Sequence, residues 1–241
     1  MNDIIERLEE SKNTNDHIVD YLDYYIDSEQ SPEYAILLKG AWGAGKTWFI
    51  KNYLKREERK SLKTIYVSLY GVTGFGEIED QFFQQLHPVL SSKAMSITGK
   101  VIKGVLKTTL KIDLDNDGKD EGSINSSIPD INLPDYLKNT NERVLIFDDL
   151  ERCNIPFNDV LGYINYFVEH QGQKVIILAN EDEILKNQSG EHSQRYKDIK
   201  EKLIGKTFKI IPNISEAMKH FLSLVSCAET KYFLRRMRIF F

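Results

Sequence analysis

The segment YAILLKGAWGAGKT, residues 34–47, places a short apolar run directly before a glycine-rich turn. The apolar run at 34–39 predicts a buried strand, and a helix is predicted from Lys46 to about residue 58. The turn and the two residues after it match the pattern G-x-x-x-x-G-K-[ST] at every fixed position. Because the pattern lies between a strand and a helix, where backbone N–H groups can surround an anion, it predicts a phosphate-binding loop.

The residue types of this loop fit its expected chemistry. Glycines let the backbone approach phosphates closely, and the helix that follows adds the positive end of its dipole. The Lys46 ammonium would contact the β- and γ-phosphates, which makes it a predicted catalytic residue, and the Thr47 hydroxyl would ligate Mg²⁺. The predicted nucleotide-binding residues are Gly40, Ala41, Trp42, Gly43, Ala44, Gly45, Lys46, Thr47 and Trp48.

A second segment, RVLIFDDLER at residues 143–152, supplies the carboxylates that such a loop needs. Its four central apolar residues predict a buried strand directly before Asp148. We expect Asp148 to support the metal ion together with Thr47, and Asp149 to orient or deprotonate the attacking water. The alternative interpretation is a solvated acidic turn after a strand.

A third polar position follows another predicted strand, at 174–179, which ends directly before Asn180. A polar side chain at the carboxyl end of a strand beside the metal strand can contact the γ-phosphate or the attacking water. Asn180 is therefore the third predicted catalytic residue, after Lys46 and Asp149. Taken alone, an asparagine after a strand is most often a turn residue.

Strands and helices alternate along the chain. We expect strands at 34–39, 64–69, 144–147, 174–179 and 207–211, and helices at 14–28, 46–58, 77–90 and 157–169. This alternation is typical of βαβ units, so the predicted fold class is α/β, with about five parallel strands and helices on both faces. Residues 91–140, a lysine-rich stretch followed by an Asp-, Gly- and Ser-rich one, form an irregular insertion in this pattern. The predicted nucleotide-binding domain spans 1–212, and 213–241 would begin a truncated helical region.

The composition limits the class of protein. The chain has 241 residues, with 32 Lys+Arg against 36 Asp+Glu, so its net charge is −4, and 41% of its residues are hydrophobic. These values fit a folded domain and give little support to nucleic-acid binding. No apolar run approaches the roughly 20 residues of a spanning helix, and the N-terminus lacks a signal peptide, so we expect a cytoplasmic protein without a transmembrane segment. The two cysteines, Cys153 and Cys227, lie far apart, which agrees with a reducing compartment.

The two main motifs together carry a family resemblance. The run G-x-W-G-x-G-K-T at 40–47, followed by an apolar run and D-D-L-E-R-C at 148–153, is similar to the KAP family of P-loop NTPases. The resemblance implies ATP rather than GTP, and no guanine-reading N-K-x-D motif follows the second segment. It also implies the additional-strand division of P-loop folds, in which the metal strand and the loop strand are separated. Bacterial members of such families often act in defence against phage.

The leading functional hypothesis is ATP binding and hydrolysis with Mg²⁺, used as a conformational switch. Kinship with signal-transducing, oligomerising NTPases implies a second copy of the chain or a partner protein as the responder. The alternative is a nucleotide-gated module that binds a protein or DNA with little turnover, and phosphotransfer to a small molecule has less support. Two departures from the family stand out: the lysine-rich segment 91–113 replaces a transmembrane insertion, and the chain ends soon after Pro212.

Other features give weaker signals. DLDNDG at 113–118 resembles the start of a calcium-binding EF-hand loop, but the twelfth position is isoleucine rather than glutamate, so we favour an acidic turn. Arg152 would be a salt-bridge partner of Glu151 or of the sheet, or an arginine acting across a subunit boundary. Arg195 and Lys202 are lesser candidates for phosphate contacts.

Overall fold

The computed structural model describes residues 14–86, 143–186 and 191–213, with side chains described throughout except at 191–195. The strands are β1 (Ala35–Lys39), β2 (Lys63–Ser68), β3 (Arg143–Asp148), β4 (Lys174–Ala179) and β5 (Ile204–Lys209). The helices are α2 (Asp16–Asp27), α3 (Lys46–Leu54), α4 (Phe75–Leu86), α7 (Phe157–Glu169), α8 (Glu181–Lys186) and α9 (Glu191–Leu203), with short 3₁₀ turns η1 (Glu57–Arg59) and η2 (Leu150–Arg152). The predicted insertion, its EF-hand-like segment and residues 214–241 lie outside the described residues.

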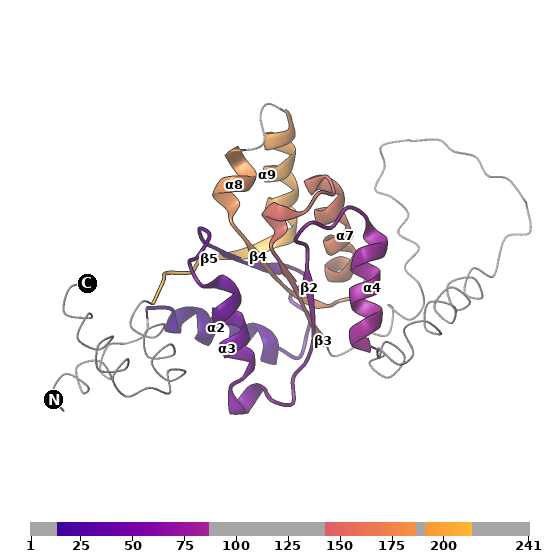
Figure 1. Ribbon diagram of the computed structural model, residues 1–241. Coiled ribbons are helices and arrows are strands. Elements are labelled where there is room, and N and C mark those ends of the chain that lie inside the picture. The colour runs from indigo at the N-terminus through magenta and orange to yellow at the C-terminus, as the bar shows by residue number, and fades with distance from the viewer. Residues whose placement is uncertain (1–13, 87–142, 187–190, 214–241) are drawn as a thin grey trace, which may run out of the picture.

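The five strands form one parallel sheet in the order β2-β3-β4-β1-β5 (Figure 1). β4 lies between β1 and β3, so the strand before the glycine turn and the strand that carries Asp148 are not neighbours. Because the strands are parallel, the carboxyl ends of β1, β3 and β4 meet at one edge of the sheet. The predicted five-stranded parallel α/β fold is confirmed, whereas the assignment to the additional-strand division stays a prediction.

Helices cover both faces of the sheet, and strand side chains alternate between them. On one face, Ile36 and Leu38 lie in a core with the apolar sides of α2 and α3. On the other face, Leu37 and Phe147 lie in a core with α4, α7 and α9. β1, β3 and β4 are therefore buried almost throughout, which explains why they read as continuous apolar runs in the sequence.

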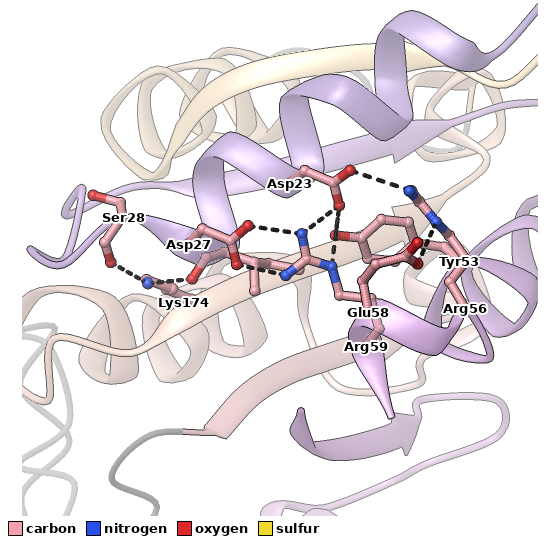
Figure 2. Close-up of polar contacts among 9 residues, drawn as sticks. Asp23, Asp27, Ser28, Tyr53, Arg56, Glu58, Arg59 and Lys174 are labelled. Atoms are coloured by element: carbon pink, nitrogen blue, oxygen red, sulfur yellow. Dashed lines mark hydrogen bonds and ion pairs between the residues drawn. The ribbon is translucent and has the colours of Figure 1, made fainter. Parts of the chain in front are cut away.

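A polar cluster ties α2 to the end of α3 and to η1 (Figure 2). The Arg59 side chain is only 9% exposed, and its guanidinium donates hydrogen bonds to the carboxylates of Asp23 and Asp27. The Tyr53 hydroxyl donates to Asp23 Oδ1 at 2.8 Å, and Arg56 pairs with Asp23 Oδ2 at 3.2 Å. These contacts fix the helix that precedes β1 against the helix that follows the glycine turn.

The last strand differs from its predicted position. β5 runs from Ile204 to Lys209, whereas the sequence predicted 207–211, because Gly205 and Lys206 interrupt the apolar pattern near the start of the strand. Its pairing with β1 is irregular between Ala35 and Ile36, and Gly205 falls in that irregularity. A Cβ on Gly205 would lie 2.3 Å from the Tyr34 ring, so the ring packs where only glycine fits.

Other boundaries and two helices also differ from the prediction. α3 ends at Leu54 rather than near residue 58, and η1 takes up part of the remainder. α8 and α9 were not predicted: α8 has 6 residues, and α9 is so rich in charge that its buried residues, Tyr196 and Leu203, leave little periodic signal. None of the helices in the described segments has the length and apolar character needed to cross a membrane.

Two glutamines of α4 bond to the backbone of the edge strand β2. Gln81 donates to Ser68 O at 2.8 Å and accepts from Ser68 N at 2.9 Å. Gln85 repeats this arrangement with Tyr66, at 2.7 Å and 2.9 Å. Each side-chain amide thus takes the place of a neighbouring strand, which satisfies outward backbone groups of β2. The helix therefore lies along the outer edge of the sheet as well as over one of its faces.

Candidate nucleotide-binding site

The glycine turn has the backbone that its sequence predicts. Gly43 and Gly45 have φ values of 78° and 87°, in the left-handed region that glycine adopts without strain. Gly40 is also closely packed, since a Cβ there would lie 3.1 Å from the Ala44 Cβ. Its N–H donates to Ala179 O at 3.2 Å, which fixes the start of the turn to the end of β4. Gly45 then forms the N-cap of α3, so the first helical N–H groups lie beside the loop.

Lys46 lies inside this turn. Its side chain is buried, and the ammonium donates to Gly40 O at 2.8 Å and to Ala41 O at 3.3 Å. These two carbonyls hold the charge at the centre of the loop, where a bound phosphate would lie. The contact of Lys46 with the β- and γ-phosphates stays a prediction.

Thr47 and Asp148 come together across the sheet. The Thr47 hydroxyl, in the first turn of α3, donates to Asp148 Oδ2 at 2.7 Å, although β4 separates β3 from β1, the strand that leads to Thr47. The Tyr66 hydroxyl, from β2, donates to the same oxygen. Burial of the phenol, followed by this hydrogen bond to a carboxylate, raises the pKa of Tyr66. The two residues predicted to support a metal are therefore in contact, and the sequence analysis missed that Tyr66 bonds to the same carboxylate.

Asp149 continues from Asp148 with an unusual backbone. Its φ of 59° lies in the left-handed region, and its N–H donates to Asp148 Oδ1 at 2.8 Å. Burial raises the pKa of Asp149, and the charges of Asp148 and Glu151 add to this effect, while Arg152 and Lys46 oppose it. A carboxylate whose pKa is raised binds a proton more readily, which is the property that a general base needs.

The Glu151 carboxylate joins the loop to the end of β4. Its Oε1 accepts a hydrogen bond from Trp42 Nε1 at 2.9 Å, and its Oε2 accepts one from Asn180 N at 2.9 Å. Arg152 does not pair with Glu151. Its guanidinium lies 5.2 Å from the ring centroids of both Trp42 and Tyr70, and its Nε lies 3.8 Å from Asp149 Oδ1. The predicted ion pair of Arg152 with Glu151 is thus wrong, whereas its action across a subunit boundary stays a prediction.

Asn180 is buried directly after β4, and its neighbour Glu181 fixes that position. Glu181 Oε2 pairs with Lys39 at 2.8 Å, and its Oε1 accepts from Lys200 and, at 3.3 Å, from the Tyr196 hydroxyl. Burial alone would raise the pKa of Glu181, but the hydrogen bonds from Lys200 and Lys39 outweigh it and lower the pKa. The end of β4 is therefore fixed by charged contacts to β1 and α9.

The sequence analysis proposed three further residues for the site: Trp48, Lys202 and Arg195. Trp48 lies in the first turn of α3, half-buried. Lys202 pairs with Glu169 at 2.9 Å where α7 and α9 end, at the opposite edge of the sheet from the glycine turn. The side chain of Arg195 lies outside the described residues. Lys202 is thus wrong as a phosphate contact in this arrangement, and Trp48 stays a prediction.

The residues present fit a bound Mg²⁺. Thr47 offers a hydroxyl oxygen and Asp148 a carboxylate oxygen, and hard oxygen ligands of this kind suit magnesium. Among the residues that the structure describes, no group of three or more His, Cys, Asp or Glu could hold a metal ion alone. Magnesium sites commonly combine one or two protein oxygens with substrate phosphates, so this small donor set is sufficient.

Several solved structures align with the chain at low identity. Cdc6p from Pyrobaculum aerophilum aligns with a TM-score of 0.45 and 12% identity, over 89% of this chain and 49% of that one. A DNA replication initiation factor gives 0.43 and 13%, over 95% and 58%. The replication initiator DnaA, bound to AMPPCP and single-stranded DNA, gives 0.42 and 14%, over 94% and 58%. The chain thus spans 49% to 58% of the length of these structures. In sequence, it has no significant match among curated proteins.

The family comparison covers most of the chain. The model of the KAP family P-loop domain matches residues 15–235. This range contains the glycine turn, the Asp148–Asp149 pair and Asn180, whose arrangement is described above. Membership in a P-loop family and the geometry of the turn both support nucleotide binding. The chain belongs to the KAP family of P-loop NTPases.

Proposed function

We propose that the chain binds ATP with Mg²⁺ and hydrolyses it. The observation that carries this proposal is the 2.7 Å contact between Thr47 Oγ1 and Asp148 Oδ2, made beside the buried ammonium of Lys46. Two segments about a hundred residues apart thus place an ammonium, a hydroxyl and a carboxylate around the N-terminus of α3, as a site for a metal-bound triphosphate requires.

Binding would use the loop backbone and Lys46. The first N–H groups of α3 and the turn would donate to the phosphate oxygens. The Lys46 ammonium would exchange its contacts with Gly40 O and Ala41 O for contacts with the β- and γ-phosphates. Thr47 and Asp148 would hold Mg²⁺, which, when bound, neutralises charge that develops on the phosphates. The family resemblance and the lack of a guanine-reading motif favour ATP over GTP.

Hydrolysis would use Asp149 and Asn180. Asp149, with its raised pKa, would orient a water molecule and accept its proton. Asn180, at the end of β4, would contact the γ-phosphate or the same water. Glu151 is less suited to act as the base because both of its oxygens already accept hydrogen bonds.

A second candidate is a nucleotide-gated binding module with little turnover, and the position of Arg152 favours it. An arginine that stabilises the transferring phosphate is worth roughly 10³–10⁵ in rate. Arg152 instead lies between Trp42 and Tyr70 and pairs with Asp149 of its own chain. An isolated chain would therefore bind Mg-ATP but turn it over slowly, on the order of less than one per second. In both candidates, kinship with the family suggests a conformational switch in a cytoplasmic defence response to phage.

Phosphate release and particle size, measured for the purified chain with and without ATP, test the proposal. We expect nucleotide binding in the presence of Mg²⁺ together with phosphate release. Binding with only trace release would favour the second candidate. Turnover per chain that rises with protein concentration, and that Arg152→Ala reduces without changing affinity, would indicate that Arg152 acts across a subunit boundary. A chain that binds neither ATP nor ADP would overturn the proposal.

A further inference from the structure

We infer that Glu151 is a positioning residue, which couples the nucleotide loop to Asn180 and so helps the site to distinguish ATP from ADP. The inference rests on the proposed function, because it assumes that Asn180 contacts the γ-phosphate. It assigns to Glu151 a role different from that of a base. The observation that carries it is that one carboxylate accepts hydrogen bonds from both Trp42 Nε1 and Asn180 N.

The backbone around Glu151 is fixed. The left-handed φ of Asp149 turns the chain at the end of β3 into η2, where Arg152 N donates to Asp149 O at 2.9 Å. A second hydrogen bond holds this turn in place, since Arg152 O accepts from Gly71 N at 2.9 Å. The side chain of Leu150, in the same turn, is buried. Glu151 thus extends from a rigid support toward the loop and the end of β4.

Trp42, by contrast, is held mainly through its indole group. The side chain is 55% exposed, its N–H donates to Glu151, and one face of the ring lies against the Arg152 guanidinium. Trp42 is the third residue of the glycine turn, so a nucleotide that changes the turn would change the Trp42–Glu151 contact. The same carboxylate holds Asn180 N at 2.9 Å, which provides a direct physical link between the loop and the residue proposed to contact the γ-phosphate.

The chemistry of this link requires a carboxylate. Both partners of Glu151 are N–H donors, and a carboxylate can accept from both. A glutamine of the same size has one acceptor and one donor, so its NH₂ group would face either the Trp42 indole N–H or Asn180 N–H. Glu151→Gln would therefore release one end of the link without removing the side chain.

The test measures dissociation constants for ADP and for a non-hydrolysable ATP analogue, with Mg²⁺ present. We expect Glu151→Gln to reduce the preference for the analogue over ADP by about 3- to 10-fold, the scale of one lost hydrogen bond. Trp42→Phe should give a similar loss, and the double variant should match the single ones because both break the same link. In an Asn180→Ala background, Glu151→Gln should have no further effect on the preference. The matched control is Glu57→Gln, an exposed residue paired with Lys60, which should leave the preference unchanged.

The outcomes separate the inference from the proposed function. A merely structural Glu151 would lower the melting temperature and weaken both nucleotides equally, and an unchanged preference in Glu151→Gln would overturn the inference alone. Should Glu151→Gln fail to fold, Trp42→Phe tests the same link, and full preference in that variant also overturns the inference. A wild-type chain that binds neither nucleotide overturns the proposed function and this inference with it.

Discussion

The Tyr66 hydroxyl donates a hydrogen bond to Asp148 Oδ2, so a residue of the edge strand β2 holds the carboxylate that is proposed to support the metal. The same oxygen accepts from Thr47, and Asp148 Oδ1 accepts from Asp149 N. Asp148 is therefore oriented by three separate donors. Hydrogen bonds of this kind orient a carboxylate that supports a metal ion and contribute to the affinity of the site for that ion.

Tyr66→Phe should raise the Mg²⁺ concentration needed for half-maximal nucleotide binding, roughly 10-fold or more, which is typical when such a supporting contact is lost. The ring stays in place, so the packing of β2 changes little. Nucleotide binding titrated with MgCl₂ measures the effect. Tyr70→Phe, which removes a hydroxyl from a tyrosine that is 63% exposed, is the matched control. An unaltered magnesium titration in Tyr66→Phe would show that this hydroxyl does not position Asp148.

Lys46→Ala should weaken binding of Mg-ATP by roughly 10- to 100-fold, because charge-assisted hydrogen bonds contribute about 1.5–3 kcal/mol. Calorimetric titration gives the affinity, and the melting temperature shows whether the loop variant is still folded. Lys55→Ala, at the exposed end of α3, should bind as the wild type does. Affinity that Lys46→Ala leaves unchanged would contradict the assignment of the glycine turn as the phosphate site.

Asp149→Asn should separate binding from chemistry. The amide has the size of the carboxylate, and asparagine tolerates the left-handed backbone at this position. It cannot accept a proton from water, so hydrolysis should fall roughly 10²-fold or more while the affinity for Mg-ATP stays nearly the same. Single-turnover phosphate release measures the rate, with the exposed Asp159→Asn as a control. If Asp149→Asn is fully active while Glu151→Gln is inactive, the base is Glu151.

Arg59→Gln should lower the free energy of unfolding at pH 7 by about 1–3 kcal/mol, since it removes charged hydrogen bonds from a partly exposed cluster. Burial raises the pKa of Asp23, but hydrogen bonds from Tyr53 and Arg59 outweigh it. The hydrogen bond from Arg59 is the main cause that lowers the pKa of Asp27. Both carboxyl groups therefore titrate below their ordinary value of 3.8.

The sign of the pH dependence follows from these lowered pKa values. The stability that the two carboxylates contribute is present above pH 3.8 and is lost as the pH falls through their lower values in the folded state. The difference between wild type and Arg59→Gln should thus shrink below that pH, as measured by urea unfolding at a series of pH values. Lys60→Gln, in an exposed pair, should have little effect. A difference that is equal at pH 7 and pH 3 would rule out the ion pairs as its source.

The sequence was sufficient to predict β1, β3 and β4, but not the bounds of β5 or the presence of α9. β1, β3 and β4 are buried on both faces, so their apolar runs and the polar residues after them could be recognised directly. β5 and α9 are rich in polar residues and depend on contacts with distant residues, such as Tyr34 against Gly205, which leave no local pattern. For the same reason, the sequence could not show that Tyr66 reaches Asp148 or that Glu151 joins Trp42 to Asn180.

The glutamine contacts of α4 also show at which edge of the sheet this helix ends. Gln81 bonds to Ser68 and Gln85 to Tyr66, so α4 runs antiparallel to β2 and ends, at Leu86, toward the amino-terminal side of the sheet. β3 begins at that same side, with Arg143 paired to Lys63. The segment 87–142 therefore leaves and rejoins the described fold at the edge opposite the glycine turn. We therefore expect a change in the length of this segment to leave the contact between Thr47 and Asp148 in place.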